Sequence, residues 1–69
     1  MDAYRVAWRK DCQQAEQSEG RADQSLALSL ASAKFHRVDF SRGGYLRVWG
    51  PERVVFEADA TGIHPVRRT

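Results

Sequence analysis

The chain has 69 residues, a formal net charge of +2 and 42% hydrophobic residues. This length supports a single domain over residues 1–69 with one small core, and the composition excludes a wholly disordered chain. No apolar run approaches the roughly 20 residues of a membrane-spanning helix, so we expect no membrane partner.

The cysteine count and the N-terminal residues predict a cytoplasmic protein. Cys12 is the single cysteine, and because it cannot form an intramolecular disulfide, it fits a reducing compartment. Residues 1–5 lack the basic and then apolar pattern of a signal peptide.

Charge is distributed unevenly along the chain. Residues 1–33 carry four basic and five acidic side chains, whereas residues 34–69 carry seven basic and four acidic ones. Nine of the eleven basic residues are arginine, whose planar guanidinium forks onto carboxylates or phosphates and stacks on flat surfaces. The C-terminal half, which ends in a basic tail at residues 67–69, therefore carries the basic surplus.

The N-terminal segment alternates between large apolar side chains and smaller or basic ones. Tyr4, Val6 and Trp8 fall on one side. A period of two with β-forming residues predicts a first strand over residues 3–9. A helix with Tyr4 and Trp8 on one face, at i and i+4, is the alternative prediction.

A polar stretch and a helix follow. Residues 13–21 are polar, contain a glycine and show no apolar period, so we expect a loop. Asp23 can cap a helix that runs to about Lys34, because its carboxylate can accept from the free amides of the first turn. The side of this helix that we expect on the sheet is the stripe Ala22, Leu26, Leu30 and Ala33.

The leucines of this helical segment also alternate, so a strand is the alternative prediction there. Its alanine and serine content, without any β-branched residue, favours the helix. Leu28 and Phe35 point away from the predicted stripe, which indicates either a dimer contact or the filling of a local gap under a loop.

Three runs of β-forming residues make up the rest of the chain. Residues 35–40, 45–49 and 53–58 are separated by Ser-Arg-Gly-Gly at 41–44 and by Gly-Pro-Glu at 50–52. Glycine and proline at these places are typical of turns. The pattern predicts an antiparallel meander of three strands, with a short edge segment at residues 63–66.

The predicted fold class is α+β: a single small domain with an antiparallel sheet of about four strands and one helix packed on one face. Alternation assigns the inner side chains. They are Tyr4, Val6, Trp8, Val38, Phe40, Leu46, Val48, Val54 and Phe56, with Leu26 and Leu30 closing the core.

The same alternation places a set of arginine and aromatic side chains on the outer face, together with Asp39, Val55 and Glu57. The candidate binding residues are Arg5, Arg9, Arg37, Tyr45, Arg47, Trp49 and Arg53, with Lys34 and Arg42 at the rim. Guanidinium and aromatic groups occur together at protein hot spots and on single-stranded nucleic acid. The alternative interpretation is structural, in which arginine keeps an exposed sheet soluble and the aromatic rings pair across strands.

Catalytic and metal-binding patterns are weak. Cys12, His36 and His64 lack the spacing of a zinc site. His36 and Asp39 lie close in sequence, but the chain has no Gly-x-Ser-x-Gly motif. Residues 41–44 lack the helix that follows a phosphate-binding loop. We therefore expect no enzyme, no metal and no cofactor.

The layout resembles that of a known group of proteins. The start Met-x-Ala-Tyr-x-Val, the polar loop, the short Ala/Ser helix and the basic meander, from Met1 to about Phe56, are similar to small phage-encoded anti-CRISPR inhibitors of type I systems. The resemblance implies a non-enzymatic protein in the bacterial cytoplasm that docks on a CRISPR surveillance complex and interferes with its DNA binding. We expect the chain to be a monomer or a weak homodimer. The alternative hypothesis is a module that binds nucleic acid directly through the same face.

Overall fold

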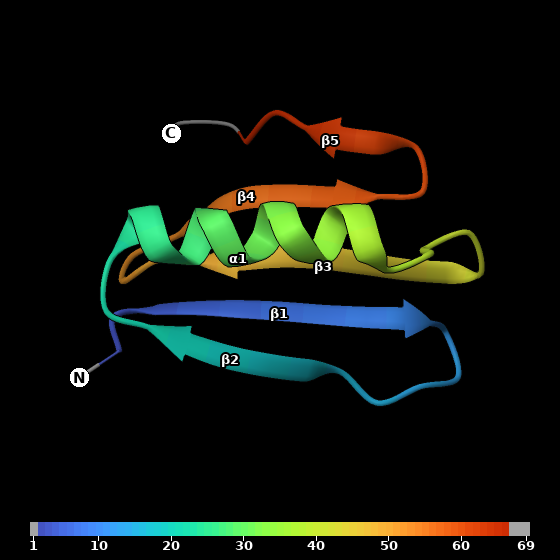
Figure 1. The fold of residues 1–69 in the computed structure, drawn as a ribbon, viewed down its shortest axis with the longest axis horizontal. Helices are drawn as coiled ribbons and strands as arrows, with labels where there is room; N and C mark the ends of the chain where they lie inside the picture. Colours follow the sequence, from blue (N-terminus) through green and yellow to red (C-terminus); the bar gives the residue numbers. More distant parts are fainter. Residues whose placement is uncertain (1, 67–69) are drawn as a thin grey trace.

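The computed structural model describes residues 2–66, which form five strands and one helix. The elements are β1 (Tyr4–Asp11), β2 (Gln17–Arg21), α1 (Gln24–Arg37), β3 (Gly43–Trp49), β4 (Val54–Asp59) and β5 (Gly62–His64). The strands form one antiparallel sheet in the order β2-β1-β3-β4-β5, with α1 across one face (Figure 1). The predicted small α+β class is confirmed. The basic tail at residues 67–69 lies outside the described residues.

The first strand is confirmed and extends further than predicted. β1 is flanked by β2 and β3, so both of its edges form ladders. Val6 and Trp8 are buried on the side covered by α1. Two paired edges explain why β1 is a strand, because the helical alternative would satisfy these backbone groups only within the segment.

The loop predicted over residues 13–21 is wrong for its second half. Residues 17–21 form the edge strand β2, antiparallel to β1, with Tyr4 opposite Arg21 and Trp8 opposite Gln17. β2 is polar because a strand at the edge of the sheet has one side in solvent and little apolar surface to cover. Its sequence therefore lacks the apolar alternation that predicts a strand.

The helix begins as predicted. The Asp23 carboxylate accepts from the Leu26 amide at 2.9 Å, which satisfies one of the free amides of the first turn. The helix continues to Arg37 and ends where the Val38 amide donates to the Lys34 carbonyl at 2.9 Å. The predicted strand over residues 35–40 is therefore wrong, and the basic side chains of the last turn suit the negative end of the helix dipole.

The predicted buried stripe of α1 is confirmed for Leu30 and wrong for Ala22, Leu26 and Ala33, which are exposed. Ala27 and Ala31 are fully buried, whereas Leu26 is 51% exposed. Leu28 and Phe35, which we expected to point away, pack against the core, as does Leu30. Small alanines at the centre let the helix lie close to the sheet, and larger side chains fill the space on either side of them.

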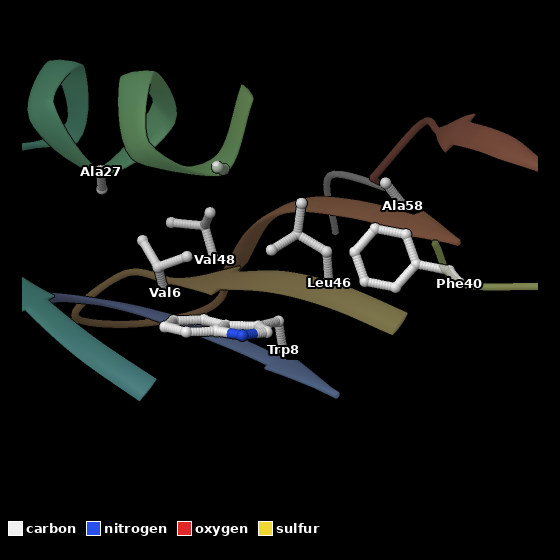
Figure 2. Close-up of a cluster of buried hydrophobic side chains, with 8 residues drawn as sticks. Val6, Trp8, Ala27, Phe40, Leu46, Val48 and Ala58 are labelled. Carbon is white, nitrogen blue, oxygen red and sulfur yellow. The ribbon is translucent and has the colours of Figure 1, made fainter. Parts of the chain in front are cut away.

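Under the helix, the core consists of the inner side chains of β1, β3 and β4 with Phe40 (Figure 2). Leu46, Val48 and Val6 are its largest fully buried side chains. Phe40 lies in the connection from α1 to β3, so its predicted burial is confirmed although the strand predicted around it is absent. Residues 41 and 42 belong to this connection and Gly43 and Gly44 begin β3, so the predicted hairpin at 41–44 is wrong.

A register shift between Val48 and Trp49 changes the predicted sides of β4. Val48 lies opposite Phe56, but Trp49 lies opposite Val54. Val54 therefore joins Trp49 on the outer side, and Val55 packs against the core. A bulge of this kind places two residues opposite one and breaks simple alternation. Among residues 2–66, no helix is long and apolar enough to cross a membrane.

Candidate binding surface

The face of the sheet opposite α1 presents a stripe of arginine and aromatic side chains. We call this the open face. It comprises Arg5, Ala7 and Arg9 of β1 and Tyr45, Arg47 and Trp49 of β3. Cross-strand pairing sets these residues side by side in three rungs: Arg5 opposite Trp49, Ala7 opposite Arg47, and Arg9 opposite Tyr45.

Tyr45 is the centre of the most ordered part of the open face. The guanidinium carbons of Arg9 and Arg47 lie 5.0 and 4.7 Å from its ring centroid, within the range of a cation–π contact. The Tyr45 hydroxyl donates to the Glu16 carboxylate, and this hydrogen bond raises the pKa of Tyr45. The ring and both guanidinium groups are therefore held in place before any partner arrives.

Ala7 lies at the floor of this face, opposite Arg47. It is only 1% exposed although no helix covers it, and the stems of neighbouring arginines are long enough to cover such apolar surface. The Nε atom of Arg9 is buried and has no hydrogen-bond partner among residues 2–66. Arg9 thus contributes mainly through stacking on Tyr45.

The other arginines of the open face have polar partners. Arg5 donates to the Ser18 hydroxyl at 2.8 Å, and Arg47 lies 3.6 Å from the Glu57 carboxylate. Both contacts are exposed, so each contributes little to stability and can be exchanged for contacts with a partner.

Trp49 is the large aromatic residue that the face leaves to solvent. It is 45% exposed, at the end of β3, with Arg5 opposite it on β1. Tryptophan side chains are usually more deeply buried than this, because their large apolar rings gain free energy on leaving water. Trp49 and Arg5 together form the accessible end of the stripe.

Acidic side chains border the stripe on both sides. Glu16 reaches Tyr45 from the segment before β2, and Glu57 and Asp59 belong to β4 on the same side of the sheet. Three arginines are therefore matched by three carboxylates. The sequence predicts a more basic face because Glu16 lies in the predicted loop and Asp59 lies beyond the predicted strand at residues 53–58.

Four of the predicted binding residues lie elsewhere. Arg37 ends α1, Arg42 lies in the connection that follows it, and Lys34 places its ammonium 4.3 Å from the Trp8 ring centroid on the covered side. Arg53, in the turn before β4, lines a shallow pocket with Tyr4, Gln24, Gly50, Pro51, Glu52 and Val55. Asp39 also leaves the sheet, and its carboxylate accepts from the Ser41 amide at 3.0 Å, which lowers the pKa of Asp39.

A hydroxyl, an imidazole and a carboxylate meet at the turn between β4 and β5. The Nε2 atom of His64 lies 2.8 Å from Asp59 Oδ1 and 3.0 Å from Thr61 Oγ1. The same ring nitrogen contacts both oxygens, whereas a catalytic triad uses the two nitrogens on opposite sides of the ring. The hydrogen bond from the Thr61 hydroxyl, and after it the one from His64, lower the pKa of Asp59 to about 2. This cluster therefore stabilises the turn.

No three histidine, cysteine, aspartate or glutamate side chains are grouped as metal ligands within the described part of the chain. Comparison of the chain with models of protein families, with curated proteins and with solved structures found no match in any of the three.

Proposed function

We propose that the chain is a small non-enzymatic binding protein whose open face docks on a protein surface. The observation that carries this proposal is Trp49, which is 45% exposed beside Arg5 and in line with the ordered Tyr45. Tryptophan, tyrosine and arginine are the side chains most enriched among residues that dominate binding energy. Ordered side chains also lose less entropy when a partner binds.

The charge pattern favours a protein over nucleic acid. A phosphate backbone requires a surplus of positive charge, whereas the three arginines of the open face are bordered by Glu16, Glu57 and Asp59. A protein surface with both signs of charge complements this pattern better.

The specific partner that we propose comes from the resemblance to type I anti-CRISPR proteins. In that case the chain acts in the bacterial cytoplasm as an inhibitor: it docks through the open face on a protein subunit of a CRISPR surveillance complex and interferes with DNA binding by the complex. Trp49 and Arg5 would supply the central contact, with Arg47 next to them.

A binding titration against a purified type I surveillance complex tests this proposal. Trp49→Ala and Arg5→Glu should each weaken binding by at least about tenfold, the effect of losing a hot-spot residue. The matched controls are Ile63→Ala, which truncates another exposed apolar side chain, and Arg37→Glu, which reverses an arginine on the other side of the molecule. Unchanged binding by both open-face variants, with circular dichroism showing a native fold, would refute the use of this face.

The second candidate function is direct binding of single- or double-stranded nucleic acid. It is favoured by one observation, the arrangement of Arg5, Arg47 and Trp49 within two adjacent strands. Salt separates the two functions, because binding to phosphates weakens steeply as salt rises. Tight binding to a DNA or RNA oligonucleotide with a steep salt dependence would replace the protein partner by nucleic acid.

A further inference from the structure

We propose that two copies of this chain associate weakly through β2, with the free edge of β2 in one copy pairing antiparallel with β2 of the second copy about a twofold axis at Gly20. The two five-stranded sheets would then form one continuous sheet. This surface adjoins Arg5 of the open face, which lies opposite Gly20, but it uses β2 and none of the residues of the open face, so the inference does not rest on the proposed function.

The two outer edges of the sheet differ in their protection. β5 has three residues and is followed by Pro65, which has no amide hydrogen to donate. β2 has five residues in continuous register with β1 and contains no proline, lysine or bulge. Natural edge strands usually carry one of these features, because a regular free edge pairs with another strand. The edge of β2 is therefore open to a partner strand once the Arg21 guanidinium, which donates to the Gly20 carbonyl at 2.6 Å and to Glu19 at 3.0 Å, exchanges these contacts for contacts with the second copy.

The charges along β2 select a second copy of the same strand. Glu19 and Arg21 lie on the same side of the sheet, 3.0 Å apart, with side chains 43% and 35% exposed. In an antiparallel pair centred on Gly20, Glu19 of each copy lies opposite Arg21 of the other, so the favourable pair occurs twice. A pair centred on Glu19 or on Arg21 would instead set like charges directly opposite each other, which destabilises a sheet.

Alternation along β2 fixes how the copies face each other. Residues opposite one another in an antiparallel pair point to the same side. The pairing of Glu19 with Arg21 therefore places both α1 helices on one side of the joined sheet. Gly20 at the axis brings no side chain between the two strands.

The helix supplies a second feature on the same flank. Lys34 lies over Trp8 of β1. Leu30 and Leu26 precede Lys34 by four and eight residues, and at about 100° per residue they are rotated by about 40° and 80° from it, away from Ala31 and toward β2. Leu26, 51% exposed, thus lies on the β2 flank of the helix, the side on which the second copy would lie.

The contact is short, so the association is expected to be weak and to depend on concentration. Sedimentation velocity of the full chain from micromolar to millimolar concentration should show a reversible monomer–dimer equilibrium. Glu19→Arg and Arg21→Glu each set like charges opposite one another twice and should raise the dimer Kd by about tenfold. The double variant Glu19→Arg/Arg21→Glu restores opposite charges and should restore the dimer.

The matched control is Glu52→Arg, the same charge reversal in the exposed turn before β4, which should leave the Kd unchanged. Circular dichroism checks that each variant is folded. A chain that stays monomeric over the whole concentration range would overturn the proposal. Single variants that dimerise like the original chain, or a double variant that does not recover, would equally exclude this register of β2.

Discussion

Leu46 and Leu26 allow the same substitution to be compared at two sites that the sequence predicts to be alike and the structure shows to differ in burial. The sequence places both side chains in the core, whereas in the structure Leu46 is fully buried and Leu26 is 51% exposed. Substitution by alanine removes three carbon atoms in each case. The comparison therefore isolates the effect of the environment.

At Leu46, the lost transfer free energy is about 2.4 kcal/mol, at about 0.8 kcal/mol for each buried carbon. The cavity left between β3 and α1 adds about 24 cal/mol per Å³, so the total loss should be about 3 to 5 kcal/mol. At Leu26, half of the side chain is already in water, and alanine is the better helix former. The loss there should be about 1 kcal/mol or less.

Urea unfolding followed by circular dichroism, at a protein concentration low enough to keep the chain monomeric, measures both changes. A domain of this size has a total stability of only about 3 to 10 kcal/mol, so Leu46→Ala risks leaving the chain unfolded. Leu46→Val, with an expected loss of about 1 to 1.5 kcal/mol, then provides the comparison. Equal losses at Leu26 and Leu46 would refute the observed rotation of α1 and restore the stripe predicted from the sequence.

Three further predictions follow from local contacts. Asp23→Ala should destabilise the chain by about 1 kcal/mol and Asp23→Asn by much less, because only alanine removes the acceptor for the Leu26 amide; equal losses in urea unfolding would contradict this. Gly44→Ala should destabilise by at least about 2 kcal/mol, since a Cβ there would collide with the Arg9 carbonyl oxygen of the neighbouring strand; an unchanged melting temperature would count against it. Hydrogen bonds from Thr61, then His64, lower the pKa of Asp59 from 3.8 to about 2, so its contribution to stability is present above pH 3.8 and is lost as the pH falls toward 2. In urea titrations across this range, Asp59→Asn should lose less stability with falling pH than the original chain, and parallel curves would exclude the effect.

Strands with apolar alternation and turns with glycine or proline could be predicted from the sequence. β1, β3 and β4 carry β-forming side chains that alternate between a covered and an open side, and the turn at residues 50–52 contains Gly50 and Pro51. Local chemistry was also sufficient at the start of α1, where the Asp23 cap depends on residues within one turn.

Features that depend on distant residues could not be predicted. β2 is a strand because β1 offers it a free edge, and nothing within Gln17–Arg21 indicates that edge. The rotation of α1 depends on how closely alanines 27 and 31 approach the sheet, and a hydrophobicity pattern favours the leucines instead. The bulge at Trp49 requires the register between β3 and β4, which alternation alone does not contain.

The candidate site shows the same division. Arg5, Arg9, Tyr45, Arg47 and Trp49 share one face because alternation within a strand is local. Arg37 and Arg53 were assigned to that face only because residues around them were expected to be strands. The acidic border could not be predicted because Glu16 is brought to the face by the segment before β2, and because β4 extends to Asp59, beyond the predicted end of that strand.

β1 is synthesised before the other strands of the sheet, yet it lies between β2 and β3 in the finished sheet. Since β3 ends at Trp49, most of the chain must be synthesised before β1 has both neighbours. Until then Val6 and Trp8 have no helix–sheet core to enter, and a nascent chain in this state exposes them to chaperones and proteases. Truncation anywhere before β3 should therefore yield a fragment that is degraded, because no shorter N-terminal piece contains the pairing that buries its first strand.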